Sequence, residues 1–185
     1  MSKEKEKTSV RPELKVKGLL VENGVEIFEK PSIDMLSSRG YGTSENNSFQ
    51  LMFHEALYLL DKGMIEIKDE NDENVDFHRL LQSFKAKDEN AWAKYLTYRD
   101  LRSRGYVVRE GFGLDVCFRV YERGAYGKEP ARYLILSIQE GKPVSLENLT
   151  RVLRRCQSLK KKLILAVMNR RGEIVYYSVS QLNLK

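Results

Sequence analysis

The order of apolar patterns along this 185-residue chain predicts a mixed α and β fold in two lobes. Short apolar alternations and helix-spaced runs share the first half, which predicts a small N-terminal α+β lobe with an antiparallel sheet and helices. Strands alternate with helices in the second half, which predicts a C-terminal α/β lobe around a central mixed sheet. We therefore expect a disordered polar tail over residues 1–11, an N-terminal domain over 12–87 and a C-terminal domain over 88–185.

The N-terminal lobe is predicted to begin with a hairpin. Two short apolar alternations in residues 14–28 flank Asn23-Gly24, a dipeptide typical of tight hairpin turns. Residues 31–48 are rich in turn-forming residues. We therefore expect a connection with at most one short helix there.

Two helices and a short strand complete this lobe. From Phe49 onward, apolar residues recur on one helical face, which predicts a helix that Ser48 caps and Gly63 ends. A short strand follows at residues 64–67, and a second amphipathic helix at residues 77–84. We expect the lobe to close just after this helix.

The C-terminal lobe is predicted to begin with a helix that Asp88 caps and Gly105 ends. A strand follows at residues 106–109. The next strand, residues 114–121, alternates apolar with other side chains. This alternation places Tyr121 on the face opposite the apolar set.

The remainder of the lobe has the pattern of a strand, a helix and two more strands. Residues 132–138 form a continuous apolar run, which is typical of a strand buried on both sides. Ser145 caps a helix that runs into the lysines at 160–162. Two strands follow at residues 163–168 and 173–179. A hairpin loop joins them, and it has a glycine at the position that requires a positive φ.

Composition and charge narrow the class of protein. The chain is 42% hydrophobic and 31% charged, which is ordinary for a soluble protein, and it holds no apolar run long enough to span a membrane. Its first thirty residues show no signal-peptide pattern, so we expect a cytoplasmic protein. Cys117 and Cys156 are the only cysteines and lack metal-site spacing. We therefore expect no disulfide framework, no metal and no other cofactor.

A basic segment suggests a polyanionic partner. The chain has 32 Lys and Arg against 26 Asp and Glu, a net charge of +6. Eight of the basic residues lie between Arg151 and Arg171, in a stretch without any acidic residue. Two interpretations stay open: a surface that binds nucleic acid, or a solvated helix face followed by an exposed turn. Charge in the sequence does not separate them.

Three motifs resemble a known family. Residues 98–106 read YRDLRSRGY and residues 118–124 read FRVYERG, and both resemble the C-terminal domain of archaeal tRNA-splicing endonucleases. Residues 56–63, ALYLLDKG, resemble a helix in the N-terminal lobe of these enzymes. The resemblance covers nearly the whole chain, and it implies that the C-terminal lobe is nuclease-like.

The resemblance also implies a chemistry, which is RNA cleavage without metal. In these enzymes a ribose 2′-hydroxyl attacks the neighbouring phosphate, which leaves a 2′,3′-cyclic phosphate and a free 5′-hydroxyl. Such a step needs a base, an acid and a cation beside the phosphate. By resemblance, Tyr121 holds the general-base position and Lys161 that of the catalytic lysine. A slip of one residue in the alignment would put Lys160 or Lys162 there instead.

Further residues are implied in RNA binding. Arg154 matches an arginine that the family uses against a bulged base, and Tyr176 falls where a second stacking residue is expected. Lys160 is also expected to contact RNA. Each basic or aromatic residue has an ordinary interpretation as well, as a strand tyrosine, a solvated helix residue or a cation that favours a helix C-terminus.

The histidine of the family's cleavage site has no counterpart in this chain. Its position corresponds to Pro130, which has no proton to give. His54 and His78 are the only histidines, and both lie on predicted helices of the N-terminal lobe. We expect them to be ordinary, partly exposed or hydrogen-bonded side chains rather than substitutes. The isolated chain should therefore be inactive or nearly so.

Three functions fit these residues. The first is the structural, RNA-positioning subunit of a heterotetrameric endonuclease, which pairs with a catalytic chain, two copies of each, and binds precursor tRNA at a bulge-helix-bulge. The second is an active homo-oligomer in which Lys128 or a bound water replaces the histidine. The third is a stand-alone protein that binds structured RNA. The sequence leaves the oligomeric state open.

Overall fold

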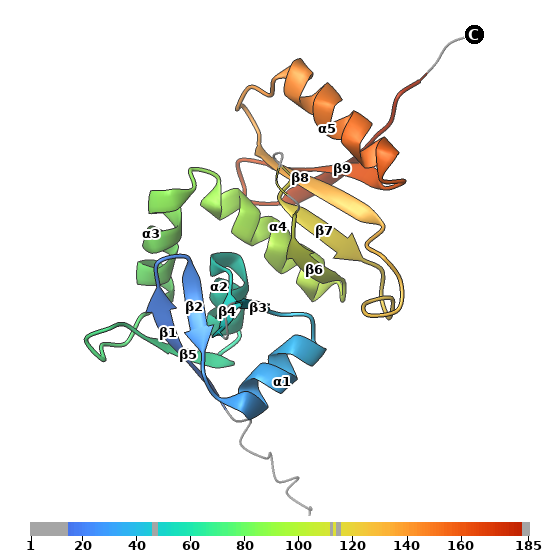
Figure 1. Ribbon diagram of the computed structural model, residues 1–185. Helices are drawn as coiled ribbons and strands as arrows, with labels where there is room; N and C mark the ends of the chain where they lie inside the picture. Colours follow the sequence, from blue (N-terminus) through green and yellow to red (C-terminus); the bar gives the residue numbers. More distant parts are fainter. Residues whose placement is uncertain (1–14, 46–47, 112, 114–115, 183–185) are drawn as a thin grey trace, which may run out of the picture.

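The computed structural model describes residues 15–45, 48–111, 113 and 116–182, and the predicted tail at residues 1–11 lies outside them. The first half forms, in chain order, β1 (Val16–Val21), β2 (Gly24–Ile27), α1 (Lys30–Ser38), β3 (Thr43–Glu45), β4 (Ser48–Leu51), α2 (Phe53–Asp61), β5 (Ile65–Lys68) and α3 (Phe77–Lys87). Its strands make a five-stranded sheet in the order β3-β4-β2-β1-β5 (Figure 1). The pair β1 and β5 is parallel and the other neighbours are antiparallel.

The predicted hairpin at Asn23-Gly24 is confirmed. Strands β1 and β2 pair antiparallel, with Val21 opposite Gly24. Gly24 has a φ of 149°, and a Cβ added there would lie 2.1 Å from the carbonyl oxygen of Leu51. Only glycine fits this close approach between β2 and β4.

Two predictions for the following segment are wrong. Residues 31–48 hold the strand β3 as well as most of the helix α1. Helix α2 begins at Phe53 rather than at Phe49, because Phe49 lies in β4. Phe49 and Leu51 are buried while Ser48 and Gln50 are partly exposed, which is the period of a strand. Phe49 also lies at a helical spacing from Phe53, so the apolar pattern fitted both structures.

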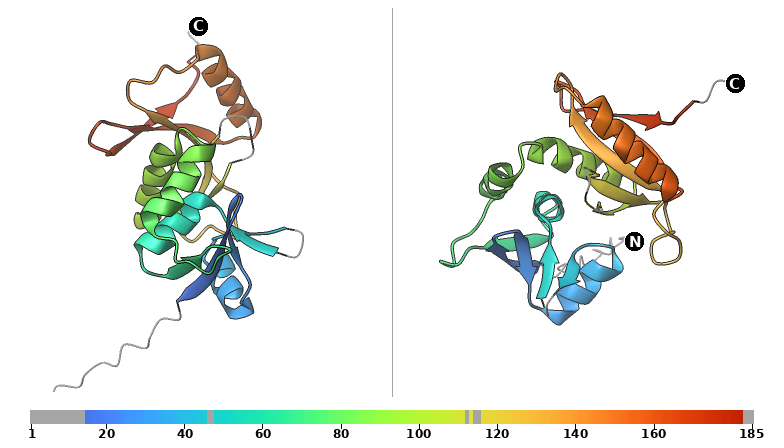
Figure 2. Two further views of the ribbon diagram at one scale, coloured as in Figure 1. Left: turned by 90° about the vertical axis from the view of Figure 1, so that its left-hand side faces the viewer. Right: turned by 45° about the horizontal axis from the view of Figure 1, so that its top comes forward.

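The second half forms α4 (Ala91–Ser103), β6 (Val107–Glu110), β7 (Phe118–Tyr121), β8 (Tyr133–Gln139), α5 (Leu146–Ser158), β9 (Lys162–Met168) and β10 (Ile174–Val179). Its sheet has the order β10-β9-β8-β7-β6, and because only β8 and β9 are parallel, the central sheet is mixed as predicted. Helices α4 and α5 cover opposite faces of this sheet (Figure 2). The cap predicted for α5 is also confirmed, since the Ser145 side chain accepts a hydrogen bond from the Asn148 amide.

Two details of this half differ from the prediction. Asp88 follows α3 and does not cap α4; Asn90 holds the cap position, and Asp88 accepts a hydrogen bond from its amide at 2.8 Å. The strand predicted over residues 114–121 covers only its last four residues. Cys117, expected on the face of Tyr121, is buried, and its Sγ accepts a hydrogen bond from the Ser137 amide at 3.3 Å. Residues 114 and 115 lie outside the described part.

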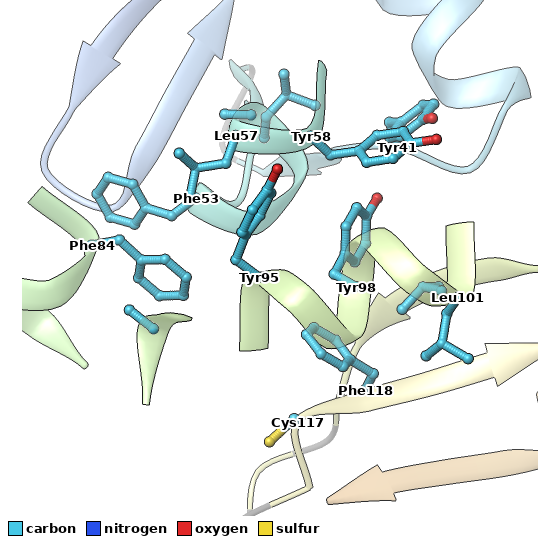
Figure 3. Close-up of a cluster of buried hydrophobic side chains, with 14 of the residues drawn as sticks. Tyr41, Phe53, Leu57, Tyr58, Phe84, Tyr95, Tyr98, Leu101, Cys117 and Phe118 are labelled. Atoms are coloured by element: carbon cyan, nitrogen blue, oxygen red, sulfur yellow. The ribbon is translucent and has the colours of Figure 1, made fainter. Parts of the chain in front are cut away.

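One hydrophobic core runs through both halves (Figure 3). The Tyr98 ring on α4 lies 5.8 Å from the Tyr58 ring and 4.7 Å from the His54 ring, both on α2. It also lies 5.9 Å from the Phe118 ring on β7. Helices α2 and α4 therefore pack side by side, and the core is continuous across the predicted domain boundary at residue 87, which stays a prediction.

Candidate active site

The end of β7 brings Tyr121 beside the first residues of β8 and β9. The Arg132 amide donates to the carbonyl oxygen of Val120, and the Lys162 amide donates to that of Arg132, each at 3.1 Å. Tyr121, Arg132 and Lys161 therefore stand in one row across three adjacent strand ends. With strands about 4.8 Å apart, the backbones of Tyr121 and Lys161 lie about 10 Å from each other. The fold thus brings together the two residues to which the resemblance assigns cleavage roles.

Alternation along the strands determines which face this row occupies. Phe118 and Val120 on β7 are buried, and Phe118 packs against the Tyr98 ring of α4. Tyr121 is half-buried and points to the other face, as predicted. Lys161 directly precedes β9, and the same alternation turns it to that face, over which α5 lies.

The backbone around Lys161 is fixed by the end of α5. Its amide donates to the Cys156 carbonyl oxygen at 2.9 Å, and its Nζ donates to the Ala131 carbonyl oxygen at 2.5 Å. Lys160, just before it, is exposed and has a φ of 55°, in the left-handed region. Lys161 is therefore bound to backbone next to Pro130, whereas the Lys160 side chain is open to solvent.

The surroundings of Tyr121 are aromatic and charged. The Tyr126 ring packs edge-on against the Tyr121 ring, with centroids 5.1 Å apart and an interplanar angle of 89°. Glu122 accepts hydrogen bonds from Arg132 Nη1 at 2.7 Å and from the Tyr133 hydroxyl at 3.1 Å. A tyrosine ring and a carboxylate-guanidinium pair therefore lie close to Tyr121.

Neither histidine replaces the missing one. The expectation that His54 is partly exposed or hydrogen-bonded is wrong. It is buried in α2, and its Nε2 has no hydrogen-bond partner among the described residues, the nearest charge being Glu110 at 3.7 Å. Burial, then the cations of Lys94 and Arg109, lower the pKa of His54 to about 3, so the ring is neutral at neutral pH. His78 is exposed on α3, as expected.

The predicted RNA-binding residues fall on two sides of the sheet. Arg154 is exposed on α5, whose apolar side buries Val152 and Cys156. Tyr176 pairs with Ala166 on β9 and faces α4, on the side opposite Tyr121. Within one chain Arg154 and Tyr176 therefore do not meet over the same base, and their contacts with RNA stay a prediction.

Asp100 on α4 lies within the YRDLRSRGY motif, but the sequence alone predicted no role for it. Its carboxylate accepts a hydrogen bond from the Tyr176 hydroxyl at 2.6 Å and two from Arg104, at 2.7 and 3.2 Å. Burial, and then the Asp100 carboxylate, raise the pKa of Tyr176 well above its ordinary value. The spacing of Asp100 and Arg104 by four residues was a readable signal for their helix pair. The link to Tyr176 depends on the fold and was not.

The described part of the chain shows neither a candidate metal cluster nor a candidate membrane-spanning helix. There, no group of three or more His, Cys, Asp or Glu side chains is placed to hold a metal ion. None of the described helices has the length and apolar character required to cross a membrane. The candidate site is therefore built from the row at the strand ends and the basic helix beside it.

Comparison with known proteins places the chain in a family. Residues 16–81 match the family model described as tRNA intron endonuclease, N-terminal domain, and residues 91–176 match the one described as tRNA intron endonuclease, catalytic C-terminal domain. The tRNA-splicing endonuclease of Methanococcus maripaludis is 33% identical over 94% of this chain and 98% of its own length. That of Pyrococcus furiosus is 34% identical over 82% of this chain and 86% of its own. With both domain models matched in order and relatives aligned over most of their lengths, the chain belongs to the tRNA intron endonuclease family.

Proposed function

We propose that this chain is the structural, RNA-positioning subunit of a tRNA-splicing endonuclease. It pairs with a catalytic chain, two copies of each, and helps to bind precursor tRNA at the bulge-helix-bulge of the intron boundaries. The observation that carries the proposal is Pro130, at the position that the resemblance assigns to the family's catalytic histidine, while Tyr121 and Lys161 lie in one row across the strand ends. The names of the relatives support the wider function of tRNA splicing.

The chemistry of the row supports a non-catalytic role. Cleavage by the 2′-hydroxyl needs a proton donor for the leaving 5′-oxygen, and loss of a general acid costs a factor of roughly 10² to 10⁴. Proline has no proton to supply. His54 on α2 is neutral and buried, and it packs against the face of β7 opposite to Tyr121. Lys161 already donates to the Ala131 carbonyl oxygen. A chain with these features would bind the RNA backbone more readily than cleave it.

The surface beside the row supports RNA positioning. On α5, Arg151, Arg154 and Arg155 are exposed, and the exposed Lys160 follows in the turn after the helix ends at Ser158. This cationic surface lies over the sheet face that carries Tyr121, so it suits a phosphate backbone. Strand β10 lies at the edge of its sheet, and its free edge suits pairing with a strand of the catalytic chain.

Cleavage of a bulge-helix-bulge RNA tests the proposal directly. The purified chain is assayed alone, and then mixed with the catalytic-type subunit from the same organism, with a chelator present in both. We expect cleavage only in the mixture. In the mixture, Tyr121→Phe and Lys161→Ala in this chain should leave cleavage nearly unchanged, whereas the matching changes in the partner should abolish it. Cleavage by this chain alone overturns the proposal.

One observation favours a second candidate, an active homo-oligomer. Glu122 follows Tyr121 directly and accepts a hydrogen bond from Arg132 of the row at 2.7 Å, so a carboxyl group does lie beside the row. If the chain alone cleaves RNA, Glu122→Gln should then reduce the rate by at least tenfold while RNA binding persists. An unchanged rate in this variant would remove Glu122 as the substitute acid.

A further inference from the structure

A second pocket lies on the other face of the C-terminal sheet, next to the end of α4. Its volume is about 240 Å³, and its walls include three tyrosines and one arginine. The residues that line it are Leu101, Arg104, Tyr106, Val120, Tyr133, Ile135, Ile164 and Tyr176. We call it the tyrosine pocket. Val120 and Ile135 are buried, so the wall of the pocket combines aliphatic side chains with the three tyrosines.

Each tyrosine of the pocket is held in place by a charged neighbour. The Tyr176 hydroxyl donates to Asp100 at 2.6 Å, and the Tyr133 hydroxyl donates to Glu122 at 3.1 Å. The guanidinium of Arg123 lies 5.7 Å from the centre of the Tyr106 ring. Rings fixed before a ligand arrives lose little conformational freedom on binding, which favours affinity.

The charges around the pocket determine which flat ligand suits it. The carboxylates of Asp100 and Glu122 are already neutralised by Arg104 and Arg132, at 2.7 Å each. Arg104 and Arg123 are both exposed and lie close to the pocket walls. A planar ring between tyrosines and an anionic group near the arginines is the chemistry of a nucleotide in single-stranded RNA.

We propose that the tyrosine pocket binds an unpaired base of RNA, with Tyr106, Tyr133 and Tyr176 as its stacking surfaces. Asp100 acts as a positioning residue, because one carboxylate fixes both Tyr176 and Arg104. The site is separate from the row of Tyr121, since it lies under α4 on the opposite sheet face. The inference rests on the proposed function in that it gives this chain an RNA contact of its own.

Titration of the isolated full chain with a short oligoadenylate, followed by NMR, tests the pocket. The matched ligand is an abasic oligomer of the same length, which has the same phosphates and no bases. We expect saturable shifts of the amides around Tyr133 and Tyr176 with the oligoadenylate, and binding at least fivefold weaker for the abasic oligomer. Equal binding of both oligomers would reduce the contact to phosphate attraction and overturn the proposal.

Variants separate the pocket from the rest of the surface. Tyr133→Leu keeps an apolar side chain and removes the ring, and Asp100→Asn releases Tyr176 and Arg104 without removing either. Each should weaken oligoadenylate binding at least fivefold and leave the abasic oligomer unaffected. Tyr177→Leu is the matched control. Tyr177 follows Tyr176 on β10 but is exposed on the opposite face of the sheet, so its replacement should leave oligoadenylate binding unchanged.

Other outcomes also decide the question. Shifts confined to α5, with none at the pocket, would overturn the inference. So would the same pocket shifts on adding the catalytic-type subunit without RNA, because the pocket would then be a protein contact. The proposed function itself is tested by cleavage in the mixture of subunits, so a failure of the base pocket leaves that result standing.

Discussion

The two lobes differ most in charge. Residues 12–87 hold nine Lys and Arg against fourteen Asp and Glu, a net charge of −5, whereas residues 88–185 hold nineteen against ten, a net charge of +9. An acidic lobe repels a phosphate backbone and a basic one attracts it. The comparison supports the proposal that RNA contact belongs to the C-terminal lobe, while the N-terminal lobe contributes mainly to the shared core.

The contribution of the N-terminal lobe is concentrated at α2. Glu55 is buried there, accepts hydrogen bonds from the amides of Gly42 and Met52, and pairs with Arg109 from β6 at 3.5 Å. Arg109 also donates to the Gly40 carbonyl oxygen at 3.1 Å. The acidic lobe thus holds the basic one through a buried ion pair, and changes at this contact test how far the lobes depend on each other.

The largest effect is expected from Arg109→Ala. Removal of the arginine leaves the buried Glu55 carboxylate without its partner, which costs about 3 to 5 kcal/mol of unfolding free energy. Urea unfolding monitored by circular dichroism measures the loss. Lys15→Ala is the control, because its pair with Glu66 is exposed and should contribute less than about 1 kcal/mol. Equal losses in the two variants would show that the lobes are joined by apolar packing alone.

Gly40→Ala probes the same boundary by steric contact. Gly40 has a φ of 74°, and an added Cβ would lie 2.5 Å from Val107 and 3.2 Å from Tyr126 of the other lobe. We expect a loss of about 2 to 4 kcal/mol, from the left-handed backbone together with the clash. Gly63→Ala separates the two causes, since Gly63 has a φ of 67° and no atom within 4 Å of an added Cβ. It should lose only about 1 kcal/mol, and a similar loss in both would exclude the clash.

The pH dependence of stability reports on His54 and Glu110, which face each other across the lobes. Partial burial, opposed by Lys94, raises the pKa of Glu110 to about 7, so its contribution is present below pH 4.5 and is lost as the pH rises to about 7. The lowered pKa of His54 acts oppositely: its contribution is present above pH 6.5 and is lost as the pH falls towards 3.

Variants at these two positions should change the pH profile in opposite directions. Glu110→Gln should make the protein relatively more stable at pH 7 than at pH 5, compared with the unchanged chain. His54→Gln should remove part of the loss of stability on acidification below pH 6. Urea unfolding across this range measures both, and parallel profiles for all three proteins would contradict the assignment.

The smallest effect is expected on RNA affinity. Arg154→Ala should weaken binding of a bulge-helix-bulge RNA to the assembled complex only a few-fold, and should reduce the slope of log affinity against log salt by about one unit. Lys17→Ala on the acidic lobe is the control and should leave the slope unchanged, because Lys17 is exposed on β1, far from α5 in sequence and in Figure 1. A change of slope for Lys17 would break the division of roles between the lobes.

Much of the fold could be predicted from the sequence because local signals agreed with it. Asn23-Gly24, the Ser145 cap and the alternation that turns Tyr121 away from the core all act within a few residues. The start of α2 was misplaced because Phe49 fits both a helical face and a buried strand position. The alternation did not extend to Cys117 because β7 begins only at Phe118; Cys117 lies buried just before the strand, where its Sγ accepts a hydrogen bond from the Ser137 amide.

The candidate site was predictable to the extent that single residues carry the family motif. Tyr121 and Lys161 were expected to act together, and the strand register brings them into one row. The partners of Tyr176 were not predictable, since Asp100 lies 76 positions away and meets it only through packing of α4 on the sheet. His54 was misjudged for the same reason, because the packing of α2 against α4 and β7 buries it.

In the turn after α5, the residue that would give the most stable fold differs from the residue that would best bind RNA. Lys160 adopts a backbone conformation in which an L-residue costs about 1 kcal/mol relative to glycine. Lys160→Gly would remove this backbone strain and stabilise the protein. The same change would remove one positive charge from the end of the helix that we propose to hold RNA. At this residue, selection for a more stable protein and selection for a better ligand surface would choose different amino acids.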